Sequence, residues 1–315
     1  MLEAQLAQAV DVARQRTRGL SGYVVAETGY DSNINTGANS QTFSVPLFAG
    51  ASVTLDQIFQ KHASAFAGVG GGVIAYNEVE PGLRLFAGAD AKGRYNFADF
   101  NGEHFSTLSW SGNAGVRWQK GVHTGTAAVT ALENSVGGFK FDRQWGVYLQ
   151  YQRQLGPSDE TGVFGQWLDQ RHPILPSLDT RLTLAGVGWR HALGGEGSPV
   201  IELTAYYGDD RERSNDPAVG RQLLGSRVGF TRQLQIGAQL ITSLTYQKSN
   251  YGGENIFFSR RREDERYDLF LGLAFSPAKD VTVTPQIVYT RNRSNIPVVD
   301  FTREQFLVTV RRDFY

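Results

Sequence analysis

The side chains that could carry out chemistry are few in this sequence and stand far apart. Its histidines are His62, His104, His123, His172 and His191. No two of them have the His-x-His or His-Glu-x-x-His spacing of a metal site. The chain has no cysteine, which excludes disulfides, thiolate nucleophiles and cysteine metal ligands. We therefore expect no catalytic residue, no metal, no cofactor and no enzyme activity.

A glycine-rich stretch at 68–76, GVGGGVIAY, has some likeness to a phosphate-binding loop. Such a loop needs a strand before it and a helix after it, and no helix-forming pattern follows here. We interpret these glycines as part of a strand that another element approaches closely, such as the long segment 31–63 folded inward.

Composition narrows the class of protein. The 315 residues are 41% hydrophobic and carry equal numbers of basic and acidic residues, 31 of each. Zero net charge argues against nucleic acid as a partner. No apolar run approaches the roughly 18 residues of a membrane helix. A β-barrel remains open, because its strands carry only a weak alternating signal.

From Gly19 onward, hydrophobic and polar residues alternate with a period of two, which indicates β-strands. About fourteen segments have the roughly ten residues that a tilted strand needs to cross a bilayer. They are 20–30, 64–76, 81–95, 104–119, 121–132, 141–154, 160–170, 179–192, 199–208, 222–234, 237–249, 262–275, 280–292 and 302–315. The predicted fold is all-β: a transmembrane antiparallel up-and-down β-barrel of about 14 strands.

The connections alternate between short turns and long polar loops, as in outer-membrane barrels. The long ones are 31–63, 96–103, 133–140, 171–178, 209–221, 250–261 and 293–301. An even number of strands places both termini on the short-turn, periplasmic side of the outer membrane. A soluble β-sandwich or propeller is the alternative, but no propeller repeat is found and a sandwich of this strand count would be unusually large.

An apolar stripe over 2–17 predicts a short helix, so we divide the chain into a periplasmic helix, 1–18, and a barrel, 19–315. The helix would be the remnant of an upstream helical region or a plug. The first residues lack the apolar core of a secretory signal. Since a barrel must be exported, we expect further protein upstream of Met1 in the natural gene.

If the apolar face meets lipid, the alternate residues line a lumen. The lumen-lining candidates are Arg117, Gln119, Gln150, Gln152, Glu202, Thr204, Gln286 and Arg311. On the last strand Phe306, Val308, Val310, Arg312 and Phe314 share one face. Tryptophans and tyrosines near the strand ends are candidates for the aromatic girdles at the membrane surfaces.

Several short motifs resemble known families. The terminal aromatic residues look like the signal that the barrel-assembly machinery reads. Tyr30-Asp31-Ser32-Asn33 resembles the opening of barrels attached to periplasmic tetratricopeptide-repeat (TPR) proteins. Together with Arg261-Arg262, Ser294-Asn295 and the terminal Phe314, it resembles the C-terminal barrel of surface lipoprotein assembly modifiers. That resemblance implies a fourteen-stranded barrel behind TPR helices, which moves lipoproteins or secreted proteins to the cell surface.

We therefore expect an outer-membrane translocation barrel with a protein substrate delivered from the periplasm by an upstream TPR region. Lipid and lipopolysaccharide would surround it. Three alternatives stay open: an exporter of exopolysaccharide or amyloid subunits, a passive porin, and a lipolytic barrel in which Ser109 or Ser111 meets a histidine across strands.

Overall fold

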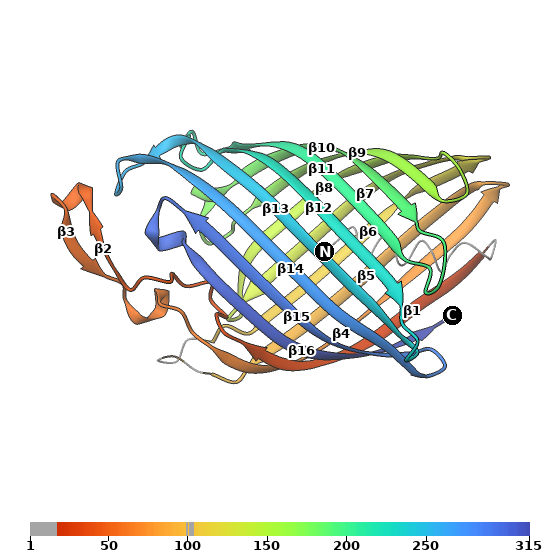
Figure 1. The fold of residues 1–315 in the computed structure, drawn as a ribbon. Coiled ribbons are helices and arrows are strands. Elements are labelled where there is room, and N and C mark those ends of the chain that lie inside the picture. Colours follow the sequence, from red (N-terminus) through yellow and green to blue (C-terminus); the bar gives the residue numbers. More distant parts are fainter. Residues whose placement is uncertain (1–17, 99, 101–103) are drawn as a thin grey trace.

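The computed structural model describes residues 18–98, 100 and 104–315, and nearly all of them belong to one sheet closed into a barrel (Figure 1). Fourteen strands of these described residues form the wall, in agreement with the predicted fold. They are β1 (Arg18–Asp31), β4 (Ser64–Glu80), β5 (Leu83–Asn96), β6 (Thr107–Lys120), β7 (His123–Val136), β8 (Phe139–Gln154), β9 (Asp159–Arg171), β10 (Thr180–Ala192), β11 (Val200–Glu212), β12 (Arg221–Gln233), β13 (Ala238–Asn255), β14 (Arg260–Ala278), β15 (Val281–Ser294) and β16 (Phe301–Phe314).

Each strand pairs antiparallel with its neighbours in the chain, and β1 closes the barrel against β16. Val24 faces Arg312 and Tyr30 faces Phe306 in that closing ladder. Closure removes the two free edges that an open sheet would present to other chains. The prediction of an up-and-down barrel is thereby confirmed.

Burial alternates along the strands because successive side chains point to opposite sides of the wall. On β16, Phe306, Val308 and Val310 are 40–51% exposed, whereas the residues between them are half-buried. The exposed, apolar set faces outward. The inward set is polar on most strands, as in barrels whose outer face meets lipid.

Short turns join the strands at one end of the barrel, which we call the short-turn end; the other is the long-loop end. One expected long loop, 133–140, is a tight hairpin instead. β7 ends at Val136 and β8 begins at Phe139, so only Gly137 and Gly138 connect the two strands. The φ angles of these glycines are 58° and 85°. Two consecutive positive φ angles suit a type I′ turn, which two glycines adopt without steric cost.

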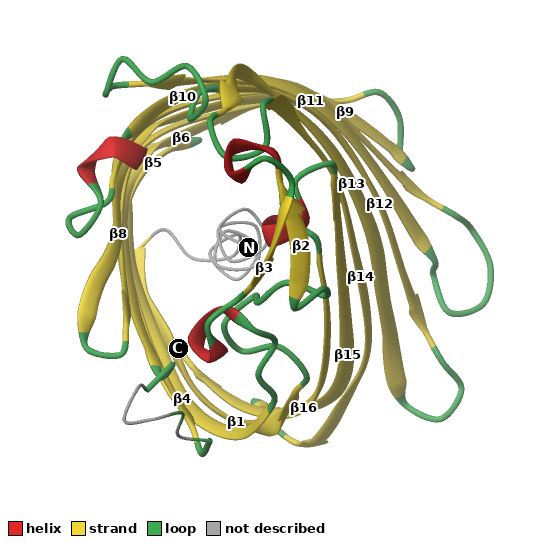
Figure 2. Ribbon diagram, turned by 90° about the vertical axis from the view of Figure 1, so that its left-hand side faces the viewer, coloured by secondary structure: helices red, strands yellow, loops and turns green. Residues whose placement is uncertain are grey.

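The segment between β1 and β4 also differs from expectation. It contains a small hairpin, β2 (Thr42–Val45) and β3 (Ala51–Thr54), and two short 3-10 helices, η2 (Pro46–Phe48) and η3 (Gln57–Phe59). Figure 1 shows the hairpin beyond the long-loop end, and Figure 2 shows it across part of the mouth. This segment therefore lies over the mouth rather than against the glycines of β4.

Those β4 glycines make room for neighbouring side chains. A Cβ at Gly68 would lie 2.9 Å from the Glu27 side chain, and one at Gly72 would lie 2.8 Å from the Tyr23 ring. The close approach that the sequence indicated is real, but the approaching element is β1.

The expected helix lies outside the described residues except for Arg18, which begins β1 instead of ending that helix. Two further 3-10 helices, η4 (Pro176–Leu178) and η5 (Pro297–Val299), lie in loops at the long-loop end. Among the described residues no helix is long and apolar enough to span a membrane.

Candidate functional site: the barrel interior

The inward face of β8 is lined by side-chain amides. Gln150 and Gln152 are half-buried there, Gln154 lies nearer the short-turn end, and Tyr148 is buried between Gln150 and Gln144. We call Gln144, Gln150, Gln152 and Gln154 the amide row. Amides donate and accept hydrogen bonds without carrying charge. This part of the wall can therefore hydrogen-bond to a polar chain or solute, although Gln144 and Gln152 also contact the carboxylates of Asp142 and Glu160.

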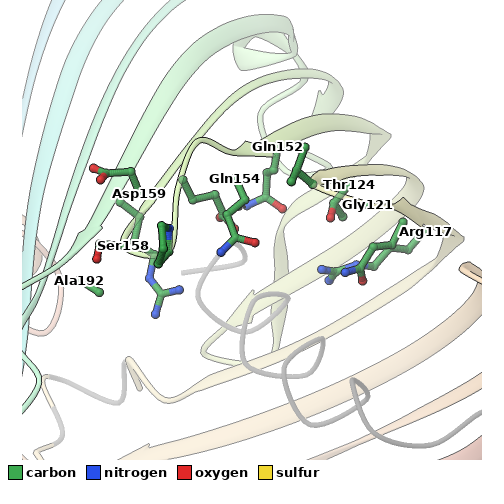
Figure 3. Close-up of a pocket in the computed structure, with 13 residues that line it drawn as sticks. Arg117, Gly121, Thr124, Gln152, Gln154, Ser158, Asp159 and Ala192 are labelled. Carbon is green, nitrogen blue, oxygen red and sulfur yellow. Dashed lines mark hydrogen bonds between the residues drawn. The ribbon is translucent and has the colours of Figure 1, made fainter.

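A cavity of about 270 Å³ opens at the short-turn end of this wall. Arg117, Gln152, Gln154 and Glu160 line it, together with residues of the turns and of β10. Figure 3 shows Arg117, Gln152 and Gln154 extending from neighbouring parts of the wall toward the same space. Gln152 donates from Nε2 to Glu160 Oε1 at 2.9 Å, which fixes one amide of the row.

Inward aromatic rings lie along the wall over glycines of the neighbouring strand. The Phe164 ring occupies the space where a Cβ of Gly186 would be, and the Tyr206 ring does the same at Gly225. Tyr206 also donates from its hydroxyl to Gln247 at 3.0 Å. Rings held flat on glycines stabilise the sheet and keep their bulk out of the interior.

The opposite part of the wall is charged. Lys92 Nζ lies 2.6 Å from Glu27 Oε2, across the glycine stripe of β4. At the long-loop end Asp31 is fully buried and accepts hydrogen bonds from Arg94, Arg303 and Gln305. A carboxylate with two guanidinium partners stays ionised when it is buried. These contacts tie β1 to β5 and β16.

The lumen-lining candidates fall into three groups. Arg117, Gln119 and Gln152 lie together in the cavity, and Gln150 is two residues further along β8. Glu202 contacts Arg190, a cavity residue, at 3.5 Å, and Thr204 follows two residues later on β11. On the other side, Gln286 faces Leu307 in the ladder. Arg311 lies there too, with its guanidinium carbon 4.0 Å from the centre of the Tyr23 ring.

The residues whose motifs resemble TPR-attached barrels and surface lipoprotein assembly modifiers, which we call the signature, gather at the long-loop end, apart from Phe314. Asp31 and Asn33 are fully buried, and Asn33 holds its loop by accepting from the Gly37 N–H and donating to the Thr302 carbonyl. Ser32 accepts from the Glu304 N–H, and Tyr30 points outward.

The second half of the signature fixes the β14–β15 end. Arg262 forms an ion pair with Asp264, with nitrogen and oxygen 2.6 Å apart. Asn295 donates to the Arg261 carbonyl, and the Ser294 hydroxyl accepts from the Ile296 N–H. Phe314, at the short-turn end, lies over Gly22. These contacts give the signature a structural role in loop anchoring and strand closure.

The serines and histidines considered for lipolysis have other partners. Ser109 donates to the Lys92 carbonyl and Ser111 to the Asp90 carboxylate, both on the inward face. His123 contacts Tyr151, and His191 contacts Asp159, on the outward face. Across the described residues, no three histidines, cysteines or acidic residues are grouped so as to hold a metal ion.

Two structures of known outer-membrane proteins resemble the barrel over nearly its whole length. A FadL homologue of Pseudomonas aeruginosa matches with a TM-score of 0.52 and 8% identity, over 95% of this chain and 91% of that one. OmpT of Vibrio cholerae matches with a TM-score of 0.51 and 10% identity, over 94% and 97%. This is the fold of an outer-membrane β-barrel. No protein-family model and no curated protein matches the sequence.

Sequence reasoning missed the charged half of this barrel interior. Lys92 and Arg94 alternate with small or apolar residues, which is a signal that they point inward. Arg303 lies between Thr302 and Glu304 and gives no such signal. The partners of these three residues are 63 to 272 residues away in the chain, so no local pattern connects them. The pairing becomes visible only with the strand register.

Proposed function

We propose that the chain is an outer-membrane translocation barrel that exports or surface-displays a macromolecule delivered from the periplasm, in the first place a lipoprotein or secreted protein. Both termini would lie in the periplasm, with a TPR region upstream, and the barrel-assembly machinery would read the terminal strand. Catalysis has no part in this proposal. The observation that carries it is the amide row, a polar inner wall behind an apolar outer face.

An extended polypeptide presents a polar backbone to its surroundings. A wall of neutral amides and hydroxyls can replace water around that backbone without selecting one charge, which suits passage of a sequence-variable chain. A channel for one small solute needs instead a few convergent polar groups in an apolar pocket.

Ion conductance in planar bilayers tests the proposal against a passive porin. An export barrel should conduct little as the intact chain and should open when residues 40–56, the β2–β3 hairpin, or residues 1–17 are deleted. A passive porin conducts in the intact form and changes little on either deletion. Large, steady conductance of the intact chain would remove the export proposal.

A second candidate is export of an exopolysaccharide. It is favoured by Tyr148, Phe164 and Tyr206, inward rings on β8, β9 and β11 that lie among the amides. Sugar rings stack on aromatic faces, and their hydroxyls bond to amides. Deleting the gene should block one of two processes. For a protein substrate it should block surface exposure of a co-expressed lipoprotein, which protease digestion of whole cells detects. For a polysaccharide substrate it should block secretion of the polymer. The outcome distinguishes the two substrates.

A further inference from the structure

The outer face of β8 to β11 carries a group of basic side chains at the long-loop end. We call this group the arginine patch; it consists of Lys140, Arg143, Arg171, Arg181, Arg211 and Arg213. Four of its members, Arg143, Arg171, Arg181 and Arg211, have side chains that are 44–79% exposed. Their outward direction follows from the register, because they alternate with inward residues and face one another across ladders.

The patch lies just beyond an aromatic girdle. Trp145 and Trp167 contact each other edge to face with ring centroids 4.9 Å apart on the outer wall. Arg143 is two residues beyond Trp145 on β8, and Asp169 is two residues beyond Trp167 on β9. Two residues of strand span about 7 Å. Tryptophans mark the border of the hydrocarbon layer, so the arginines lie at the level of lipid headgroups.

The ion pairs within the patch leave positive charge in excess. Asp169, whose side chain is 6% exposed, contacts three guanidiniums, those of Arg171, Arg181 and Arg213. Arg181 is the most distant of them at 3.7 Å. Among the described residues, Glu133, Asp179 and Asp209 are the other carboxylates that form ion pairs with members of the patch. Glu212 also acts electrostatically on Arg211. Six basic groups therefore meet five acidic ones in this part of the chain, which leaves one positive charge in excess.

The strand register increases the electrostatic repulsion between the arginines of the patch. Arg143 lies directly opposite Arg171 in the β8–β9 ladder, and Arg181 lies directly opposite Arg211 in the β10–β11 ladder. Like charges placed directly opposite destabilise a sheet. Two such pairs in neighbouring hairpins indicate that an anion from outside the chain completes the arrangement.

We infer that the arginine patch binds the phosphates of the lipid A part of lipopolysaccharide. The inference uses the proposed orientation, in which the long-loop end faces the cell surface and therefore the lipopolysaccharide leaflet. Guanidinium groups match phosphate oxygens two at a time. The neighbouring girdle and the apolar wall below it would hold the acyl chains of the same molecule.

Native mass spectrometry of the detergent-solubilised full chain tests this with three lipids. They are lipid A with both phosphates, dephosphorylated lipid A, and phosphatidylglycerol. The expected result is that bisphosphorylated lipid A binds at least about tenfold more tightly than the other two. Equal binding of all three would overturn the inference, and so would a preference for phosphatidylglycerol; neither comparison requires a variant.

Variants then locate the site. The triple variant Arg143→Gln, Arg181→Gln, Arg211→Gln should lose about tenfold in lipid A affinity. Its matched control is Arg153→Gln, Arg232→Gln, Arg312→Gln, which removes three exposed basic groups from the outer face of the barrel at the short-turn end. Equal loss in both triple variants would overturn the assignment. Binding is measured apart from transport, and surface labelling of the loops in cells reports the orientation separately.

Discussion

Asp31 and Arg303 join the first strand of the barrel to the last, with Asp31 Oδ2 2.6 Å from Arg303 Nη2. The carboxylate is fully buried and also pairs with Arg94 at 2.7 Å. One side chain at the end of β1 therefore holds both β16 and β5 in place, at the seam where the barrel closes.

Replacing this carboxylate should weaken closure. Asp31→Asn leaves two guanidiniums without their anion, and breaking a buried ion pair costs about 3–5 kcal/mol. The urea midpoint of unfolding in lipid vesicles should fall accordingly. Asp313→Asn is the control, because its pair with Arg311 lies at the more exposed short-turn end; its effect should be below about 1 kcal/mol. Similar losses for both variants would contradict the importance of the Asp31 cluster.

The glycine stripe of β4 gives a second prediction. Gly68→Val places a branched side chain against Glu27 and against the Gly93 carbonyl, each 2.9 Å from the new Cβ. Overpacking of this kind costs about 1–3 kcal/mol and should separate Glu27 from Lys92. Gly93→Val is the matched change on the outward face, where the nearest atom, from Leu108, is 3.9 Å away. Thermal unfolding of the two variants measures the difference, and equal stability would refute this steric reading.

Acid should release the segment that covers the mouth. Asn39, in that segment, donates to Asp300 at 2.9 Å, and Arg291 donates to the same carboxylate at 2.6 Å. Burial alone would raise the pKa of Asp300, but the hydrogen bonds from Arg291 and Asn39 outweigh it, so the pKa lies below its usual value. A lowered carboxyl pKa stabilises the folded contact above the ordinary value of about 4, and that stability is lost as the pH falls through the lowered pKa.

Hydrogen exchange of residues 32–63 at a series of pH values measures this release. The protection factors, which are corrected for the intrinsic exchange rate at each pH, should stay high above about pH 4 and fall below it. In Asp300→Asn the pH dependence of this segment should be much smaller, because the carboxylate that accepts from Asn39 and Arg291 is no longer present to be protonated. An unchanged acid response in that variant would assign the effect to another group.

A fourth prediction concerns how the β2–β3 hairpin is held. Phe43 contacts Phe258 with centroids 5.7 Å apart, and the Leu47 N–H donates to the Phe257 carbonyl. Phe258 is 6% exposed, so Phe258→Ala should remove about 3–5 kcal/mol of packing. The hairpin should detach, which protease cleavage within 40–56 detects. Phe59→Ala is the control, because Phe59 is 62% exposed; equal cleavage in the two would show that Phe258 does not hold the hairpin.

The wall was predictable from the sequence because its signal is local. On β16, the alternation from Phe306 to Phe314 assigns each residue to a face without knowledge of any partner. The fold class and the outward set both follow from that period. The pairs across the strands, such as Asp31 with Arg303, depend on register over the whole chain and could not be derived in this way.

Two local errors have physical causes. The segment 133–140 was predicted to be a long polar loop, although its two glycines, Gly137 and Gly138, are also what a type I′ hairpin turn requires. The strands β2 and β3 have only four residues each and were missed within 31–63, because alternation over four residues hardly differs from chance. Packing on Phe258 and the hydrogen bond to Phe257 hold the hairpin in place, and neither is a local property.

The ladder between β1 and β16 also has a consequence for the order of folding. It joins residues such as Gly22 and Phe314 from opposite ends of the chain, whereas every other ladder in the wall joins consecutive wall strands. Contacts so distant in sequence form last, because the intervening chain must be ordered first. Until they form, the growing sheet has two free edges with unpaired backbone N–H and C=O groups. A factor that covers these two edges during membrane insertion would determine whether the sheet closes on itself or pairs with another molecule.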